Sequence, residues 1–342
     1  MRKELQDAVA VFKALGWADA APEDVLRLPP GTPEQKRTAL AGLKSGEWGE
    51  FAKLSENTYG WRSFIDADSG RLALFAIRVG VDARRAANIL TTGGFSRPEL
   101  QVAVIAERGA RYASDFINHA CISRRRMFEH SASAFGNTAV RLVYSLDLDV
   151  PQTVEYIKDW SVYAAAALGL KAETRYNETD LPGLDLIEKR YAEHIRTGAA
   201  VGAPATGPFS AVLSAGVKRG LIARDEAVSV VFSALDAAIR PGDRKVWLRV
   251  LDELSVSDAE LAERAQTLIP LLSTGETAVI ERLAPTLIAR AEGGSLTELL
   301  LASLTAKTKK AREAVLKSAL GRPRPCDADA LASWLSVLAG DA

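Results

Sequence analysis

The chain has 342 residues, and its 43 lysines and arginines balance 43 aspartates and glutamates, so the formal net charge is zero. This balance excludes a generally basic protein that coats nucleic acid. With 48% hydrophobic and 25% charged residues, the composition is that of a soluble globular chain rather than a disordered, collagen-like or membrane-embedded one. The length predicts two domains or one extended array of repeats.

The compartment follows from three features of the sequence. The two cysteines, Cys121 and Cys326, lie far apart and predict no disulfide framework, which favours a reducing cytosol. Charged residues, among them Glu4 and Asp7, interrupt the apolar stretch that a signal peptide would need. The longest apolar run, 162–170, is much shorter than the ~20 residues of a membrane-spanning helix. We therefore expect a cytoplasmic protein with no membrane partner.

The N-terminal part of the chain is predicted to be helical. Apolar residues recur at helical spacing, and Pro33 and Pro151 suit the first turn of a helix, where the missing N–H is not needed. The predicted helices cover 3–15, 33–45, 47–57, 69–79, 82–91, 97–107, 110–120, 131–145, 151–168 and 184–197. Two β-branched and aromatic stretches, 72–81 and 228–232, are interpreted as helices because charges flank them at helical spacing and no Asn-Gly or Asp-Gly turn is present.

A break in the periodic pattern predicts the domain boundary. Residues 198–208 are small residues with two prolines, typical of a linker. We expect an N-terminal helical region over 1–197, a linker over 198–208 and a C-terminal helical-repeat region over 209–342. A second, polar loop is predicted over 171–182.

The C-terminal third carries the clearest periodicity. Leucines and other apolar residues repeat every three to four positions in successive segments, which indicates amphipathic helices. Helix starts are predicted near 242, 257, 276, 295, 308 and 327, and Ser257 with Glu260 fits a capping box. A pair of such helices occupies about 32–38 residues, as in helical-hairpin repeats. Pro270 and Pro285 fall inside helical patterns, where a proline bends the helix.

The last 130 residues or so resemble a family of uncharacterised bacterial proteins built from HEAT-like helical repeats. The resemblance is carried by Gly220-Leu221-Ile222 entering a helix, by Trp247 followed by Leu251 and Leu254, and by a helix from Glu260-Leu261 to Leu271-Leu272. It implies an all-α fold, an α-solenoid of stacked antiparallel helix pairs. Members of the family are often longer, so this chain is open to interpretation as a shortened form. The resemblance brings no established activity, cofactor or catalytic residue.

One group of potential metal ligands occurs in the sequence, comprising His119, Cys121, Glu129 and His130. Their spacing matches no standard zinc pattern, and we expect His119 and Cys121 to face opposite sides of a helix end, with His130 in the next connection. We therefore expect neither a metal nor another cofactor. Trp17, between Gly16 and Asp19, is the tryptophan whose position is compatible with exposure, whereas the others mostly fit core positions.

Two basic runs are the candidate binding residues. The first is Arg124, Arg125 and Arg126, whose guanidinium groups suit a phosphate or an acidic partner. The second surrounds the start of a late helix, where cations oppose the helix dipole and a bound anion would offset the cost. Its members are Lys307, Lys309, Lys310 and Arg312. For both runs the alternative is a solvated surface.

None of the common catalytic motifs, such as a nucleophile elbow, a P-loop or a dinucleotide-binding loop, is present, and a site built from dispersed carboxylates stays open. The leading hypothesis is a non-enzymatic scaffold that binds another protein on a concave solenoid face. The alternative is a nucleic-acid-binding or base-excising helical-repeat protein, with the basic residues of 61–130 and 307–317 lining one face. The sequence does not indicate an oligomeric state.

Overall fold

The computed structural model describes residues 3–45, 49–63, 69–89, 97–122, 128–174, 178–292, 294–322 and 332. Over these residues the chain is all-α, as the sequence predicts. It contains eighteen α-helices, and its one sheet is a two-stranded hairpin. Contacts divide the chain into two compact units, Met1–Arg190 (unit 1) and Tyr191–Ala342 (unit 2).

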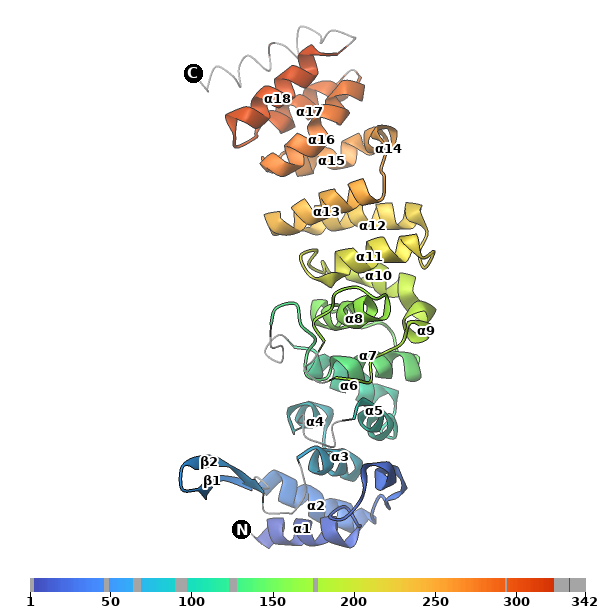
Figure 1. Cartoon of the computed structure of the whole chain (residues 1–342), viewed down its shortest axis with the longest axis vertical. Coiled ribbons are helices and arrows are strands. Elements are labelled where there is room, and N and C mark those ends of the chain that lie inside the picture. The colour runs from blue at the N-terminus through green and yellow to red at the C-terminus, as the bar shows by residue number, and fades with distance from the viewer. Residues whose placement is uncertain are drawn as a thin grey trace. The chain divides into compact units, whose positions relative to one another are not determined.

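Unit 1 is a succession of short helices interrupted by one hairpin. In chain order its elements are α1 (Lys3–Ala14), the 3-10 helix η1 (Pro22–Arg27), α2 (Pro33–Ser45), β1 (Gly49–Ser55), β2 (Thr58–Ser63), α3 (Ser69–Val79), α4 (Ala83–Ile89), α5 (Pro98–Ala106), α6 (Ala110–Ala120), α7 (Gly136–Ser145), α8 (Val154–Ala167), α9 (Leu184–Ile187) and the 3-10 helix η3 (Glu188–Arg190). Helices packed on one another are near in sequence, for example α1 on α2, α3 on α5, α5 on α7 and α7 on α8 (Figure 1).

An aromatic cluster forms the core at the start of unit 1. The Phe12 and Phe75 rings meet edge to face with centroids 5.0 Å apart, and Trp17 lies 5.5 Å from Phe75. Only 1% of Trp17 is exposed, so the interpretation of this residue as a surface tryptophan is wrong. The reason is local. Gly16 has a φ of 80°, and the Trp17 N–H bonds the Phe12 carbonyl, which turns the indole back against α1.

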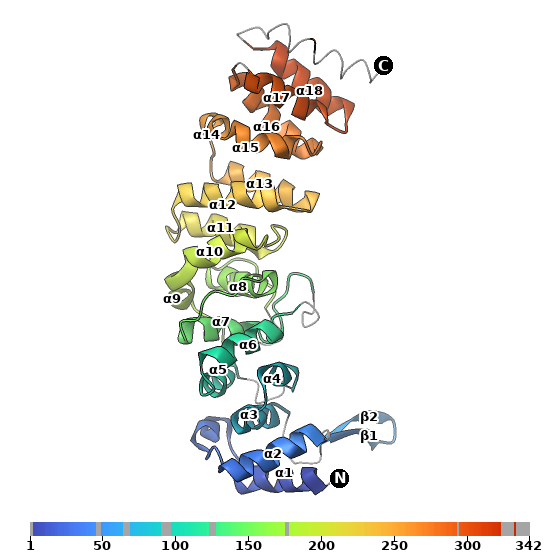
Figure 2. The same cartoon turned by 180° about the vertical axis from the view of Figure 1, so that it is seen from behind.

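The helix predicted over 47–57 is also wrong, because residues 49–55 form β1 and pair antiparallel with β2. Lys53 lies opposite Tyr59, and the register shifts between Lys53 and Ser55. β2 contains threonine and aromatic residues, which favour strands, and the polar pair Glu56-Asn57 suits the turn. Figure 2 shows the hairpin beside α2.

Unit 2 consists of helices alone over its described residues. They are α10 (Tyr191–Ala200), α11 (Pro208–Lys218), α12 (Arg224–Ala237), α13 (Pro241–Glu253), α14 (Asp258–Glu263), α15 (Ala265–Leu272), α16 (Thr277–Arg290), α17 (Gly294–Leu304) and α18 (Lys309–Leu320). The predicted linker 198–208 lies inside this unit, since its first residues end α10 and Pro208 begins α11. The helix start predicted near 327 lies outside the described residues.

One long helix of the C-terminal prediction is divided in the structure. The segment from Glu260 to Leu272 breaks at Arg264, where φ is −102° and ψ is 11°, so that α14 and α15 are separate. Pro270 lies inside α15 and Pro285 inside α16, as predicted. The ring of Pro270 faces the carbonyl of Gln266 inside α15, so the proline itself does not explain the break at Arg264.

Each helix of unit 2 packs on helices that follow closely in the chain. The packed pairs include α10 and α12, α11 and α13, α12 and α13, α13 and α16, α14 and α16, α15 and α17, and α16 and α18. Figures 1 and 2 show these helices lying layer on layer. The layers are joined by apolar side chains such as Trp247, which is 1% exposed and meets Phe209 edge to face at 5.9 Å.

Arginines join neighbouring helices in both units by a recurring contact, which we call the arginine clasp. A guanidinium group donates to backbone carbonyl oxygens at or just beyond the C-terminal end of another helix. Arg108 donates to the Ile77 carbonyl (2.8 Å) in the last turn of α3, and Arg190 donates to the Leu148 carbonyl (2.6 Å) beyond α7. In unit 2, Arg322 donates to the Ala291 carbonyl (2.6 Å) beyond α16. Carbonyl oxygens at and beyond a helix C-terminus lie near the negative end of its dipole, so a cation is a favourable donor to them.

Candidate functional site

The first predicted basic run, Arg124, Arg125 and Arg126, lies outside the described residues. The second run is divided by the structure. Lys309 and Lys310 are exposed in the first turn of α18, and Lys307 is exposed in the loop before it.

Arg312 differs from these exposed lysines because its guanidinium group binds the protein backbone. Its guanidinium group donates to the Ala306 carbonyl at 2.6 Å, and the side chain is half-buried. The start of α18 is also capped from within, because the Thr308 hydroxyl accepts the Ala311 N–H at 3.3 Å. The predicted anion site at this helix start therefore stays a prediction.

The potential metal ligands of the sequence, for which no metal site is expected, are spread over the end of α6 and the loop beyond it. His119 is exposed on α6, while Cys121 is buried directly after it. The buried Nδ1 atom of His130 has no hydrogen-bond partner. Within the part of the chain that the structure describes, no three His, Cys, Asp or Glu side chains are placed to hold a metal ion.

A different set of polar side chains is brought together in unit 1, and we call it the α7/α8 cluster. Its members come from α7, α8, the loop before α7 and the segment after α8. They are Ser133, Asn137, Arg141, Asp159, Tyr163, Glu178 and Asp180. The two helices pack on each other, and each contributes residues one turn apart, Asn137 and Arg141 from α7 and Asp159 and Tyr163 from α8.

The deepest member of the cluster is Asp159, which has no exposed surface. Its carboxylate accepts the Ser133 N–H at 2.6 Å and the Ser133 hydroxyl at 2.7 Å. Gly136, the first residue of α7, leaves the space that this carboxylate occupies, since a Cβ there would lie 2.8 Å from its Cγ and Oδ1 atoms. A buried carboxylate is costly unless it is hydrogen-bonded, and this arrangement meets that requirement.

The middle of the cluster is centred on Glu178. The Tyr163 hydroxyl donates to Glu178 Oε2 at 3.1 Å, and the Asn137 amide donates to Glu178 Oε1 at 2.8 Å. Burial, followed by the negative charges of Glu178 and Asp159, raises the pKa of Tyr163 well above its ordinary value. Tyr163 therefore stays protonated and remains a donor throughout the physiological range.

The outer end of the cluster reaches solvent. Arg141 donates from Nε to Asn137 Oδ1 at 2.8 Å and from Nη2 to Asp180 Oδ1 at 2.7 Å. The Arg141 side chain is 23% exposed, and that of Asp180 is 53% exposed. The Asn137 amide also donates to the Asp180 backbone carbonyl at 2.6 Å. The cluster thus runs from a fully buried carboxylate to an ion pair in contact with water.

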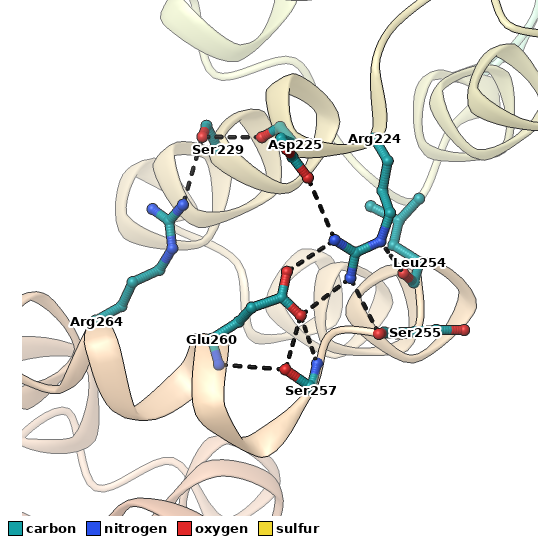
Figure 3. Close-up of polar contacts among 8 residues, drawn as sticks. All are labelled: Arg224, Asp225, Ser229, Leu254, Ser255, Ser257, Glu260 and Arg264. Atoms are coloured by element: carbon teal, nitrogen blue, oxygen red, sulfur yellow. Dashed lines mark hydrogen bonds and ion pairs between the residues drawn. The ribbon is translucent and has the colours of Figure 1, made fainter.

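A second polar cluster lies in unit 2 (Figure 3), and its charged side chains are more exposed than Asp159. We call it the α12/α14 cluster, and its members are Arg224, Asp225, Ser229, Leu254, Ser255, Ser257, Glu260 and Arg264. Arg224 is bidentate on Glu260, with distances of 2.7 and 3.1 Å, and it clasps the Leu254 carbonyl at 2.9 Å. The capping box predicted for Ser257 and Glu260 is confirmed.

These contacts stabilise the ionised form of Glu260. Its pKa is lowered to about 2, first by the hydrogen bonds from Arg224 and then by those from Ser257. Because the cluster connects α12, the end of α13 and α14, it fastens successive helices to one another. Arg224 and Glu260 bind each other and the neighbouring backbone, so we interpret this cluster as a structural contact. The α7/α8 cluster is the stronger candidate for a functional site.

Comparison of the chain with protein-family models, with curated proteins and with solved structures finds no significant match. Of the resemblance inferred from the sequence, the helix-rich, all-α character is what the structure confirms. Over the described residues, no helix has both the length and the apolar character needed to cross a membrane.

Sequence reasoning missed the α7/α8 cluster because its members are spread over almost fifty positions and form no spacing motif. A weaker signal was present. Asn137 and Arg141, and likewise Asp159 and Tyr163, lie at i and i+4 within helices that are largely buried. Buried polar groups need hydrogen-bond partners, so polar pairs on a buried helix indicate polar contacts with other parts of the chain.

Proposed function

We propose that this chain is a cytoplasmic, non-enzymatic interaction scaffold that binds another protein. In this proposal the helices of unit 2 form an α-solenoid of the HEAT-like kind, and the partner lies along its concave face. The observation that supports the proposal is the restriction of helix packing to helices close in the chain. Such packing produces a surface contributed by successive helices, which suits an extended protein partner.

Exposed apolar side chains are the residues to substitute in a test of partner binding. Ile239, in the loop between α12 and α13, is 90% exposed, and Leu320 at the end of α18 is 80% exposed. Single exposed apolar residues are common on protein surfaces, but large apolar residues are also frequent anchors of protein interfaces. Ile239 is therefore a reasonable residue with which to probe partner binding.

The test is affinity purification of the full chain from the cells that encode it, with and without nuclease treatment. We expect a protein in stoichiometric amount that is retained after nuclease treatment. We expect Ile239→Ser to reduce its recovery, with Ile239→Val as the matched control that keeps the apolar surface. Absence of any stoichiometric protein from the purified material would contradict the proposal.

The nucleic-acid alternative is an outcome of the same test. If the material recovered is lost on nuclease treatment and falls steeply as salt rises, the exposed lysines at 307, 309 and 310 become the residues to substitute. Release by salt reflects the counterions displaced from phosphates. A partner retained at higher salt instead supports protein binding.

A further inference from the structure

In the outer part of the α7/α8 cluster, donors and acceptors come from different parts of the chain. The donors stand on helices, Asn137 and Arg141 one turn apart on α7 and Tyr163 on α8. The acceptors stand on the segment Glu178–Asp180, which follows α8 and contains no helix or strand. The helices therefore present a set of donors, and a separate segment of chain fills it.

The acceptors have a simple pattern. Glu178 and Asp180 both direct carboxylates to the donors, while Thr179 between them is exposed. Alternate side chains of an extended segment lie on the same side, so an acid-x-acid sequence can present both carboxylates together. The Asn137 amide also bonds the Asp180 carbonyl, a group that every peptide carries. The donors thus fit an extended acidic peptide.

The ion pair between Arg141 and Asp180 is the part of this contact that a partner segment can replace. Asp180 is more than half exposed, and ion pairs at exposed positions contribute little net stability. If the segment detaches, Arg141 loses the carboxylate beside it, although its side chain is largely buried. A partly buried guanidinium group favours a replacement anion of the same geometry. A partner segment has to compete with a tethered one at an effective concentration of about millimolar.

We infer that Asn137, Arg141 and Tyr163 form a recognition site for an extended acidic segment of a protein partner, and that Glu178–Asp180 occupies this site in the free chain as an internal mimic. The inference rests on the proposed scaffold function and specifies the chemistry of its partner. The mimic lowers the apparent affinity for the partner, because only chains with a vacated site bind.

The test uses the full chain and a fluorescent, capped peptide with the sequence of residues 178–183, Glu-Thr-Asp-Leu-Pro-Gly. Binding is measured by fluorescence anisotropy for the wild type and for the double variant Glu178→Ala/Asp180→Ala. We expect the double variant to bind the peptide about tenfold more tightly than the wild type, because its internal competitor is removed. A control peptide with Gln and Asn in place of the two acids should bind neither protein.

Three further variants keep the test decisive. Adding Arg141→Ala to the double variant should abolish binding, whereas adding Arg111→Ala, an exposed arginine on α6, should leave it unchanged. The isosteric double variant Glu178→Gln/Asp180→Asn should show a smaller gain and serves if the alanine variant folds poorly, as judged by circular dichroism.

Failure of the acidic peptide to bind a folded double variant would overturn the inference, as would binding that survives Arg141→Ala. Either result would leave the scaffold proposal standing, since that proposal is tested by recovery of a protein partner. Recovery of no protein partner, by contrast, would remove the scaffold proposal even where the peptide binds.

Discussion

The two polar clusters are made of similar groups but differ in burial. The α7/α8 cluster begins at Asp159, which is wholly buried, whereas in the α12/α14 cluster the side chains of Arg224 and Glu260 are 36% and 33% exposed. A buried polar group must find protein partners, so the contact of Asp159 with Ser133 fixes α8 against the loop before α7. The second cluster shares its charges with water and only tethers its helices. Burial, rather than residue type, decides what such a cluster contributes.

The largest effect is expected at the buried end. Replacing Asp159 by alanine leaves the Ser133 N–H and hydroxyl without the acceptor they have now. We expect the free energy of unfolding to fall by about 3 kcal/mol, since buried donors without partners carry their full desolvation cost. Denaturant unfolding gives the total, and hydrogen exchange should localise the loss to α7 and α8. The control is Asp225→Ala in the exposed cluster. If Asp159→Ala lowered the free energy of unfolding by less than this control, burial would not explain the difference between the two clusters.

A second prediction concerns the space around the buried carboxylate. In Gly136→Ala the new Cβ would lie 2.8 Å from Asp159 Oδ1, so the carboxylate or the helix has to shift. We expect a destabilisation of about 2 kcal/mol, as in other overpacked sites. The control is Gly294→Ala at the start of α17, where a Cβ would meet nothing within 4 Å. That variant should be neutral or slightly more stable, because alanine favours a helix over glycine. Equal effects of the two substitutions would show that the site is not tightly packed.

The smallest effect is expected in the exposed cluster, and it depends on pH. Arg224→Ala removes the bidentate contact with Glu260 and the clasp on the Leu254 carbonyl. We expect a loss of about 1 kcal/mol at neutral pH, in keeping with partly exposed ion pairs and hydrogen bonds. Arg224→Lys should lose less than alanine, since it keeps the charge but not the planar fork.

The sign of the pH dependence follows from the pKa of Glu260, which is lowered from 4.5 to about 2 in the folded chain. The stabilisation by this carboxylate is fully present above pH 4.5 and is lost as the pH falls through about 2. In Arg224→Ala the largest cause of the shift is gone. The wild type and the variant should therefore converge in stability towards low pH, as measured by denaturant unfolding at a series of pH values. A gap that stays constant would show that the ion pair contributes nothing.

Much of the helical architecture could be predicted from periodicity and helix-end signals. The predicted ranges 33–45, 69–79 and 110–120 coincide with α2, α3 and α6, because each has an apolar stripe bounded by proline, glycine or a charged turn. The hairpin at 49–63 was missed, since its short segments fit either period and its Glu-Asn turn is not one of the strong hairpin signals. The break at Arg264 was missed because the apolar repeat continues through it.

The candidate site was much less accessible from the sequence. Runs of like charge, such as Lys309-Lys310, are conspicuous in a sequence, yet the structure leaves these two exposed at a helix start that Thr308 already caps. The α7/α8 cluster depends instead on a long-range meeting, since Asn137 and Glu178 stand 41 positions apart. Such a long-range contact depends on tertiary packing, and the local spacing of residues in the sequence indicates it only weakly.

The arginine clasp has a consequence for how such a chain can change. Arg108, Arg190 and Arg322 hold main-chain oxygens, which are present whatever side chain occupies the helix end. The clasp therefore makes no demand on the identity of the residues it holds. A pair of helices could be exchanged for another pair, or duplicated, and the hydrogen bonds to the neighbouring helix would be kept. The inserted pair would need only to bring its own arginine.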